Sequence, residues 1–308
     1  MTRIRIPLTA VIAVAGVLLP GLVVHRAVAQ ETAPLVLRLP ATAQLAAVGG
    51  AYLGGGGIDA VFMNPAQTPS RGWGIGAARF GSAATQAAFA SATAVGRVNV
   101  AAFIRYLDYG GNGFPARPGG LTVRGADNQS SIAGGLSAAT TVKGVRLGVA
   151  TQYAEERVPL TRGGVTAVTV GAARDVSRFV VGIAVEHLGS SLNLAGTTAD
   201  LPTRVSLGAN SRRIRLGAFF DVTAGVAVSR ERDGSIGPAG TSEIIYEPVT
   251  GWTATLRASA RRVARNGDPS LQPFTIGAAL GLDRFALDYS FEPYRGTGAV
   301  HRIGIRIE

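Results

Sequence analysis

The chain has 308 residues, a formal net charge of +11, 42 glycines and no cysteine. The lack of cysteine excludes disulfides, thiolate metal sites and cysteine nucleophiles. A mean hydropathy of +0.26, with one long apolar run at the N-terminus, fits neither a disordered chain nor a helical membrane protein. Arginine supplies nearly all of the positive charge and is scattered along the chain. That distribution favours a polar lumen and contacts with anionic lipid head groups over nucleic-acid binding.

Residues 1–29 are predicted to form a signal peptide. Arg3 and Arg5 give the positive start, residues 6–24 are apolar, and Ala29 ends a small-x-small cleavage pattern. We therefore expect cleavage near Ala29 and export of the mature chain. The alternative is a membrane anchor that is retained.

Residues 30–71 are predicted to form a compact segment ahead of the strands. Within it, residues 41–66 are small, apolar and glycine-rich, with neither strand alternation nor the caps of a solvated helix. The glycine run 54–57 permits positive φ and close backbone approach, so we expect a short helix over 41–48 followed by a loop. No Lys-Ser or Lys-Thr pair follows the glycine run, which argues against a phosphate-binding loop.

From residue 72 onward the hydrophobic period is two. In residues 252–261, for example, Trp252, Ala254 and Leu256 alternate with Thr253, Thr255 and Arg257. Most segments have about the 9–11 residues that a tilted strand needs to cross a membrane. The pattern predicts an all-β fold, a closed antiparallel transmembrane barrel of about 14 strands over 72–308. The predicted strands are 72–81, 85–93, 97–109, 128–140, 145–157, 164–175, 179–189, 203–212, 216–229, 241–248, 252–263, 274–282, 284–292 and 298–307.

A soluble sandwich would also alternate, with its apolar face inward. Repeated arginine on the polar face favours a water-filled interior, because a packed core does not accept it. Very short connections also alternate with long ones, as in outer-membrane barrels. The predicted long loops, which we expect to face the exterior, are 110–127, 190–202, 230–240 and 264–273.

The opening of the mature chain resembles that of FadL-like outer-membrane barrels, and most of all the PorV/PorQ branch. The resemblance rests on Ala43, Gly49, Gly50, Ala51, Tyr52, Asp59, Ala60, Phe62, Asn64, Pro65 and Ala66. FadL-like membership implies passive passage of hydrophobic molecules through a barrel that an N-terminal hatch blocks. PorV/PorQ membership implies an accessory barrel of a type IX-like secretion system, which binds or shuttles exported proteins at the cell surface.

The candidate site lies in the hatch. The predicted hatch and turn motif comprises Gly49, Gly50, Tyr52, Asp59, Asn64, Pro65 and Ala66. The residues predicted to contact a hydrophobic ligand, together with Val48 and Tyr52, are Leu53, Ile58, Val61, Phe62 and Met63. The alternative interpretation of these apolar residues is static packing of a plug.

Nothing in the sequence indicates a reaction. His187 and His301 are far apart and lack carboxylate-rich neighbours, and no Gly-x-Ser-x-Gly or His-Glu-x-x-His motif occurs. Glu155 and Glu156 fall on opposite faces of a strand, so they cannot act as a pair. We expect no catalytic residue, metal or cofactor. The expected location is the bacterial outer membrane, and the expected partners are its lipid and either a hydrophobic small molecule or exported and secretion-system proteins.

Overall fold

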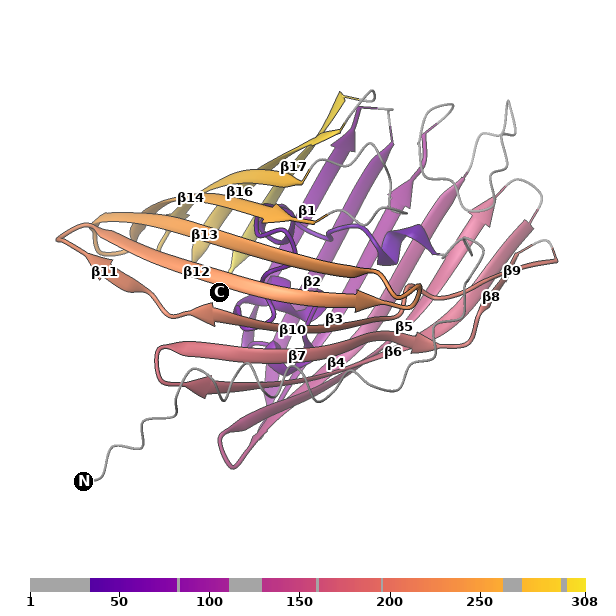
Figure 1. Ribbon diagram of the computed structural model, residues 1–308, viewed down its shortest axis with the longest axis horizontal. Helices are drawn as coiled ribbons and strands as arrows, with labels where there is room; N and C mark the ends of the chain where they lie inside the picture. Colours follow the sequence, from indigo (N-terminus) through magenta and orange to yellow (C-terminus); the bar gives the residue numbers. More distant parts are fainter. Residues whose placement is uncertain are drawn as a thin grey trace.

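A computed structural model describes residues 34–81, 84–110, 129–158, 161–194, 196–262, 273–294 and 298–308. In it, 14 antiparallel strands form a closed barrel (Figure 1), which confirms the predicted fold class. Two strand pairings that are not simple hairpins close the ring: β1 pairs with β17, and β10 pairs with β12. The barrel strands are β1 (Arg71–Phe80), β2 (Thr85–Val95), β3 (Val98–Asp108), β4 (Ser130–Val142), β5 (Val145–Val158), β6 (Thr161–Val176), β7 (Phe179–Gly189), β10 (Arg204–Ser211), β12 (Phe220–Glu231), β13 (Ile236–Val249), β14 (Trp252–Arg261), β15 (Phe274–Leu282), β16 (Phe285–Tyr294) and β17 (Gly298–Ile307).

Each predicted strand overlaps one of these, but one predicted loop is wrong. Residues 230–240 were expected to form a long loop, whereas β12 and β13 continue through them and leave only residues 232–235 unpaired. The prediction took Pro238 and its glycine neighbours for loop residues. Pro238 nevertheless fits in the ladder, because its carbonyl still accepts a bond from the amide of Arg262 at 2.9 Å.

Three shorter strands complete the sheet structure. β8 (Leu192–Leu194) and β9 (Thr197–Ala199) form a hairpin inside the predicted loop 190–202, so that loop is partly ordered. β11 (Ile214–Leu216) continues β10 alongside β12, and the pairing shifts by one residue between them. The predicted loops 110–127 and 264–273 lie almost wholly outside the described residues.

The two ends of the barrel differ. The turns β2–β3, β4–β5, β6–β7, β13–β14 and β15–β16 each have two residues between strands, and they share one end with the β10–β12 connection. We call it the short-turn end. The three longest connections, after β3, β7 and β14, all leave the opposite, long-loop end. This asymmetry is the one that the sequence predicted.

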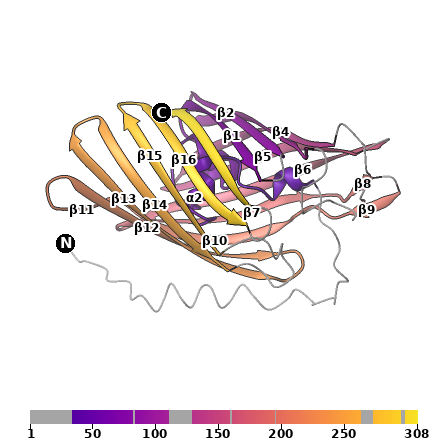
Figure 2. The same cartoon turned by 90° about the horizontal axis from the view of Figure 1, so that it is seen from above.

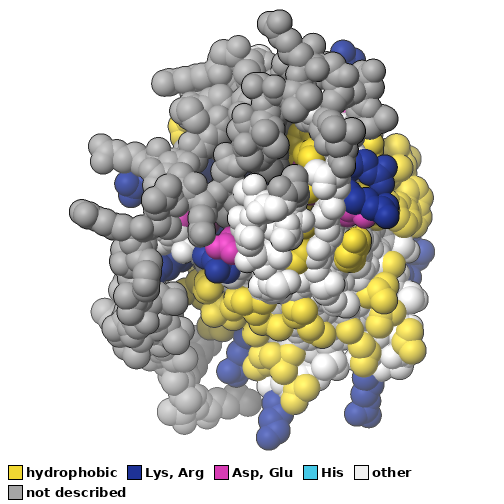
Figure 3. Space-filling model, turned by 90° about the vertical axis from the view of Figure 1, so that its right-hand side faces the viewer, with side chains coloured by type: hydrophobic (Ala, Val, Ile, Leu, Met, Phe, Trp, Pro, Cys, Tyr) yellow, Lys and Arg dark blue, Asp and Glu magenta, His cyan; other side chains and the backbone are white. Residues whose placement is uncertain are grey.

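Side chains divide by face as the alternation predicted. Large apolar side chains point outward, and Leu256, Val226 and Leu136 are 65%, 63% and 63% exposed, which only a surrounding apolar medium would cover. Figure 3 shows hydrophobic side chains gathered over the lower part of the face in view, with Lys and Arg side chains projecting below them. The inward face carries buried arginines, glutamates and aspartates.

Residues 34–70, which we call the interior segment, run through the lumen (Figures 1 and 2). They form three 3-10 helices, η1 (Leu35–Leu37), η2 (Ile58–Phe62) and η3 (Pro65–Gln67), and one α-helix, α2 (Ala43–Ala47). The predicted helix over 41–48 is thus confirmed in its central five residues. Among the described residues, no helix combines the length and apolar character needed to cross a membrane. The proposed signal peptide lies outside the described residues.

Candidate functional site: the barrel lumen

The lumen wall has two unlike sectors. From β1 to β6 the buried inward residues are mostly small and apolar, and we call this wall the apolar sector. From β13 to β17 the inward side chains include a network of opposite charges, and we call this wall the charged sector. The interior segment lies between them. η2 and η3 contact strands of the apolar sector, and α2 contacts β15, β16 and β17.

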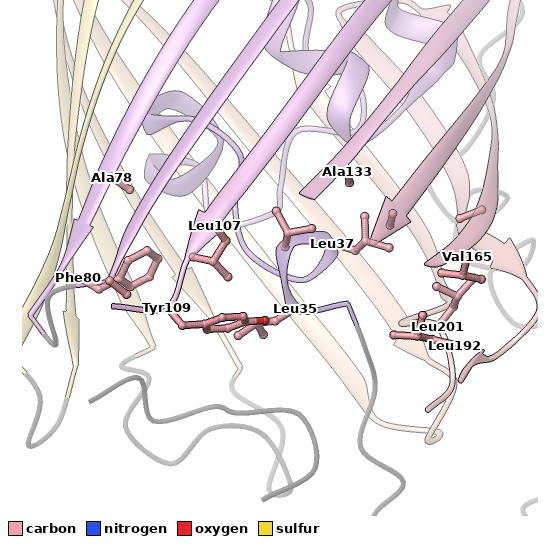
Figure 4. Packing of buried hydrophobic residues seen from close by; sticks show 14 of the residues in the cluster. Leu35, Leu37, Ala78, Phe80, Leu107, Tyr109, Ala133, Val165, Leu192 and Leu201 are labelled. Atoms are coloured by element: carbon pink, nitrogen blue, oxygen red, sulfur yellow. The ribbon is translucent and has the colours of Figure 1, made fainter. Parts of the chain in front are cut away.

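The apolar sector carries an outer cluster at the long-loop end. Leu35 and Leu37 of the interior segment pack there between Leu107 and Tyr109 of the β3 end and Val165 of β6 (Figure 4). Leu35 and Leu37 are 5% and 4% exposed, so these side chains fill this end of the lumen rather than line an open channel. The other members of the outer cluster are Val36, Ala78, Phe80, Ala84, Ala133, Ala154, Ala167, Leu192, Leu201 and Val300.

An inner cluster lies deeper in the same sector. Phe62 and Phe103 meet there edge to face at 5.5 Å between ring centroids. Small wall residues leave room for the bulkier side chains of η2. The cluster comprises Ala41, Leu45, Ile58, Val61, Phe62, Met63, Ala88, Ala90, Ala92, Ala101, Phe103 and Ala150.

Four of the five predicted ligand-contact residues, Ile58, Val61, Phe62 and Met63, therefore lie together. Leu53 is also buried but lies elsewhere, with its carbonyl close to Gly182 of β7. Val48 is buried as well. Their burial fits static packing of a plug as well as ligand contact, so the ligand role stays a prediction.

A charged residue separates the two clusters. Arg105 follows Phe103 and precedes Leu107 on the inward face of β3, and it is 3% exposed. Its guanidinium donates to the side-chain oxygen of Gln152 at 3.0 Å and lies 5.5 Å from the ring centroid of Phe62. A cation over an aromatic face is favourable when both are desolvated. A solute moving along the apolar sector would pass this group.

The wall residues of these clusters were not predicted as site residues. In β3, the alternation places Val98, Val100 and Ile104 on the outward face. The opposite face holds Phe103 and Leu107, too apolar for a water-filled lumen. These two large apolar residues on an otherwise polar face were the signal in the sequence for an apolar site in the lumen.

The charged sector is a ladder of ion pairs. Arg257 contacts Glu243 at 2.7 Å and Asp288 at 2.6 Å, and Asp288 also contacts Arg306 at 2.7 Å. Glu292 contacts Arg302 at 2.8 Å and also pairs with Arg261. Because Asp288 and Glu292 each have two cationic partners, the side chains of this wall hold one another in place.

Asn64 of the predicted turn motif holds the interior segment together. Its Nδ2 donates to the carbonyl of Leu53 at 2.9 Å and to that of Ala172 in β6 at 3.4 Å. Its Oδ1 accepts from the amide of Ala66 at 3.1 Å, which caps η3 with Pro65 as the first helical residue. The side chain thus joins two parts of the segment to the wall.

Glycines in the wall make this docking possible. A Cβ on Gly171 would lie 2.0 Å from Oδ1 of Asn64, and one on Gly148 would lie 2.3 Å from the amide nitrogen of Ala66. Two strands further along the ring from β6, the side chain of Asn210 in β10 bonds to the backbone of the segment as a neighbouring strand would. Its Oδ1 accepts from the amide of Gly54 at 2.8 Å, and its Nδ2 donates to a carbonyl of the segment at 2.7 Å.

The remaining motif residues serve local structure. Gly49 and Gly50 have φ of +59° and +87° and turn the chain after α2. The hydroxyl of Tyr52 accepts from Gln44 at 2.8 Å and donates to the carbonyl of Gly56 at 2.7 Å, so it closes the glycine loop. Burial raises the pKa of Tyr52 well above its ordinary value.

Asp59 is the one carboxylate of the interior segment, and it is buried in the first turn of η2. Burial raises the pKa of Asp59 to about 6, and Asp288 and Glu308 add to the shift, while Arg306 and a hydrogen bond with Thr42 oppose it. The group therefore changes charge near neutral pH. Within the described residues, no three His, Cys, Asp or Glu side chains are grouped so as to hold a metal.

The chain is similar in fold to solved β-barrels. No family model and no curated protein matches it. The P. putida toluene transporter TodX matches with a TM-score of 0.51 and 11% identity, over 90% of this chain and 97% of that chain. The CymD monoaromatic hydrocarbon channel matches with a TM-score of 0.49 and 10% identity, over 84% of this chain and 93% of that one.

The likeness to TodX shows the fold, a closed antiparallel β-barrel, and the FadL-like resemblance stays a prediction. The comparisons do not test closeness to PorV or PorQ, which stays a prediction.

Proposed function

We propose that this protein is an outer-membrane channel for hydrophobic small molecules and that the interior segment is its hatch. The observation that carries the proposal is the apolar sector, a one-sided strip of small and apolar side chains in a lumen whose other wall is charged. A lumen for hydrophilic solutes has no need of such a strip. The likeness to a barrel described as a toluene transporter agrees with this function.

In this mechanism the solute replaces side chains of the interior segment. Leu35 and Leu37 occupy the strip at the long-loop end, and Phe62 and Met63 occupy it further in. An apolar solute could take over their contacts with the wall at little cost, because apolar side chains of similar size exchange readily in packing. The segment would then have to leave the wall, starting at the long-loop end.

The first experiment is native mass spectrometry on protein extracted gently from outer membranes. A monomer that carries a hydrophobic adduct supports the channel. A complex with exported proteins or secretion components, without such an adduct, supports the accessory-barrel alternative instead. Absence from the outer membrane contradicts both.

A matched pair of variants tests the role of the apolar sector. Phe103→Gln places an amide in the inner cluster, whereas Thr255→Gln places one on the inward face of the charged sector. Uptake of radiolabelled toluene by cells that carry each variant should fall several-fold for Phe103→Gln alone. Equal uptake by both variants would contradict a route along the apolar sector.

Hatch movement can be tested with a reversible tether. A Cβ on Gly304 of β17 would lie 4.0 Å from the Cβ of Ala43 in α2, within the range of disulfides. Because the chain has no cysteine, Ala43→Cys with Gly304→Cys introduces one defined pair. Oxidation should stop uptake, reduction should restore it, and Ala43→Cys alone should behave as the parent. Full uptake by the oxidised pair would show that α2 does not leave the wall.

A further inference from the structure

Positive side chains gather along one part of the short-turn end. Three turns that follow one another around the ring, β4–β5, β6–β7 and β10–β12, carry them. We call this set the basic arc: Lys143, Arg146, Arg174, Arg178, Arg212, Arg213 and Arg215.

Direct contacts join these turns. Asp175 of β6 contacts Arg146 of β5 at 3.2 Å and Arg212, which follows β10, at 3.5 Å. The amide of Arg212 also donates to the carbonyl of Arg178 at 2.8 Å. The β10–β7 pairing brings Ser211 opposite Phe179, so that Arg212 lies beside the β6–β7 turn. The arc is therefore one surface rather than a set of isolated charges.

The arc has more cations than its carboxylates can neutralise. Its acidic partners are Asp175, Asp221 and Glu247. Among the described residues, no carboxylate forms an ion pair with Lys143, Arg174 or Arg178, and all three are exposed. Like charges held this close repel one another, so the surface favours an anionic ligand.

The excess charge is concentrated on one side of this end. The β2–β3 turn next to the arc adds Arg97, whereas the β13–β14 turn, Val249 to Trp252, carries no charged residue, and in the β15–β16 turn Asp283 balances Arg284. The arc is also bordered by apolar side chains on the outward face of the same strands. Phe179, Ile214, Leu216 and Phe220 are 51%, 41%, 55% and 44% exposed.

We propose that the basic arc is a binding site for the head groups of anionic phospholipids in the leaflet at the short-turn end. Arginine guanidinium groups suit phosphate because they offer parallel donors in a fixed plane. The apolar border gives the acyl chains of the same lipid a place to lie, which a soluble polyanion would not need. The inference requires only that the barrel crosses a membrane, so it does not depend on the proposed passage of hydrophobic solutes.

The test compares lipid retention by charge-matched variants. The arc variant combines Lys143→Gln, Arg174→Gln and Arg178→Gln, which breaks no ion pair of the described residues. The control combines Arg79→Gln, Arg157→Gln and Arg162→Gln at the long-loop end, with the same change in charge. Each is reconstituted in nanodiscs of phosphatidylcholine with a minority of phosphatidylglycerol, released gently, and its bound lipid is counted by native mass spectrometry.

We expect the parent and the control to retain phosphatidylglycerol in preference to phosphatidylcholine. In the arc variant this preference should fall by roughly 10-fold or more. Arg174→Lys with Arg178→Lys should retain it, and the mobility shift on heating should show that all variants are folded. Equal selectivity in the arc variant and the control would overturn the proposal. So would a parent that ignores phosphatidylglycerol but retains soluble polyglutamate in pure phosphatidylcholine discs, since the arc would then serve an acidic protein.

Discussion

At the scale of single residues, docking of the interior segment depends on a buried side chain, Asn64, whose hydrogen-bond partners are all backbone groups. Asn64 is fully buried and contacts Leu53, Ala66 and Ala172. Asparagine suits this place because its amide offers donors and an acceptor on one short side chain. The Asn-Pro-Ala turn that the sequence singled out is therefore a structural clamp between interior segment and wall.

Removing that clamp should loosen the interior segment without unfolding the barrel. Asn64→Ala leaves buried backbone groups without partners, at a cost of about 1–3 kcal/mol. Amide exchange over residues 53–66 should then accelerate by about 10-fold or more, as measured by mass spectrometry. Asn99→Ala, which removes one bond to the carbonyl of Thr68, is the milder control. Exchange that is unchanged in Asn64→Ala would contradict the clamp.

Asp59 should make docking of the interior segment depend on pH. Its pKa is about 6 when docked, above the ordinary value of 3.8, so the docked state binds the proton more tightly. The stabilisation is complete below the ordinary pKa and is lost as the pH rises through about 6. Amide exchange in η2 should therefore be slower at pH 5 than at pH 7.5, after correction for the intrinsic rate. Asp59→Asn should remove most of that difference, and an unchanged difference would assign the effect to another group.

At the scale of elements, backbone packs directly on backbone. The 3-10 helix η3 lies against β4, β5 and β6, where Gly148 and Gly171 leave no side chain between segment and wall. Short 3-10 helices have few bonds of their own, so their stability comes from this contact. Gly148 and Gly171 therefore belong to the site, as does the Asn64-Pro65-Ala66 turn that packs against them.

A single methyl group should therefore disturb docking. Gly148→Ala puts a Cβ within 2.3 Å of the backbone of Pro65 and Ala66, which cannot move aside as a flexible side chain would. Overpacking of this kind costs about 1–3 kcal/mol. Gly134→Ala in the adjacent strand is the control, since its nearest neighbour would lie at 3.6 Å. Chymotryptic cleavage after Phe62 should accelerate in Gly148→Ala only, and equal rates would contradict direct docking.

At the scale of the whole molecule, the barrel is apolar outside and divided inside. The outer face suits lipid around the ring, whereas the lumen places an apolar wall opposite a charged one. The charged wall fixes its own side chains through ion pairs, so it offers little to an apolar solute. The apolar wall holds the interior segment by packing and by a few hydrogen bonds, those around η3 and the one from Gln86 to the carbonyl of Pro40.

If the barrel spans a membrane, the free-energy cost of placing a charge on its outer face should depend on how deep the residue lies in the bilayer. Leu256→Lys near the middle of β14 should cost about 2–4 kcal/mol of unfolding free energy, and Leu282→Lys at the short-turn end of β15 about 0–1 kcal/mol. Both leucines point outward, at 65% and 59% exposure. Denaturant unfolding in lipid bilayers measures the two costs. Equal costs would contradict a membrane-spanning orientation.

The sequence by itself determined the fold class, the strands and the face that each strand turns to the membrane. It could do so because alternation with period two is local and continues through a whole strand, as in Trp252 to Arg261. It also identified the Asn64-Pro65 turn as part of the candidate site. It misjudged residues 230–240, because the same proline and glycine signals occur in turns and in paired strands.

Only the tertiary structure decided what lines the lumen. The apolar sector joins inward residues of strands as far apart as β1 and β6, and the ring order that brings them together is fixed by long-range pairing. The contact between Arg105 and Phe62 and the pairing of Asp175 with Arg146 and Arg212 likewise join distant parts of the chain. Such contacts leave no periodic trace in the sequence, because each depends on the closure of the barrel as a whole.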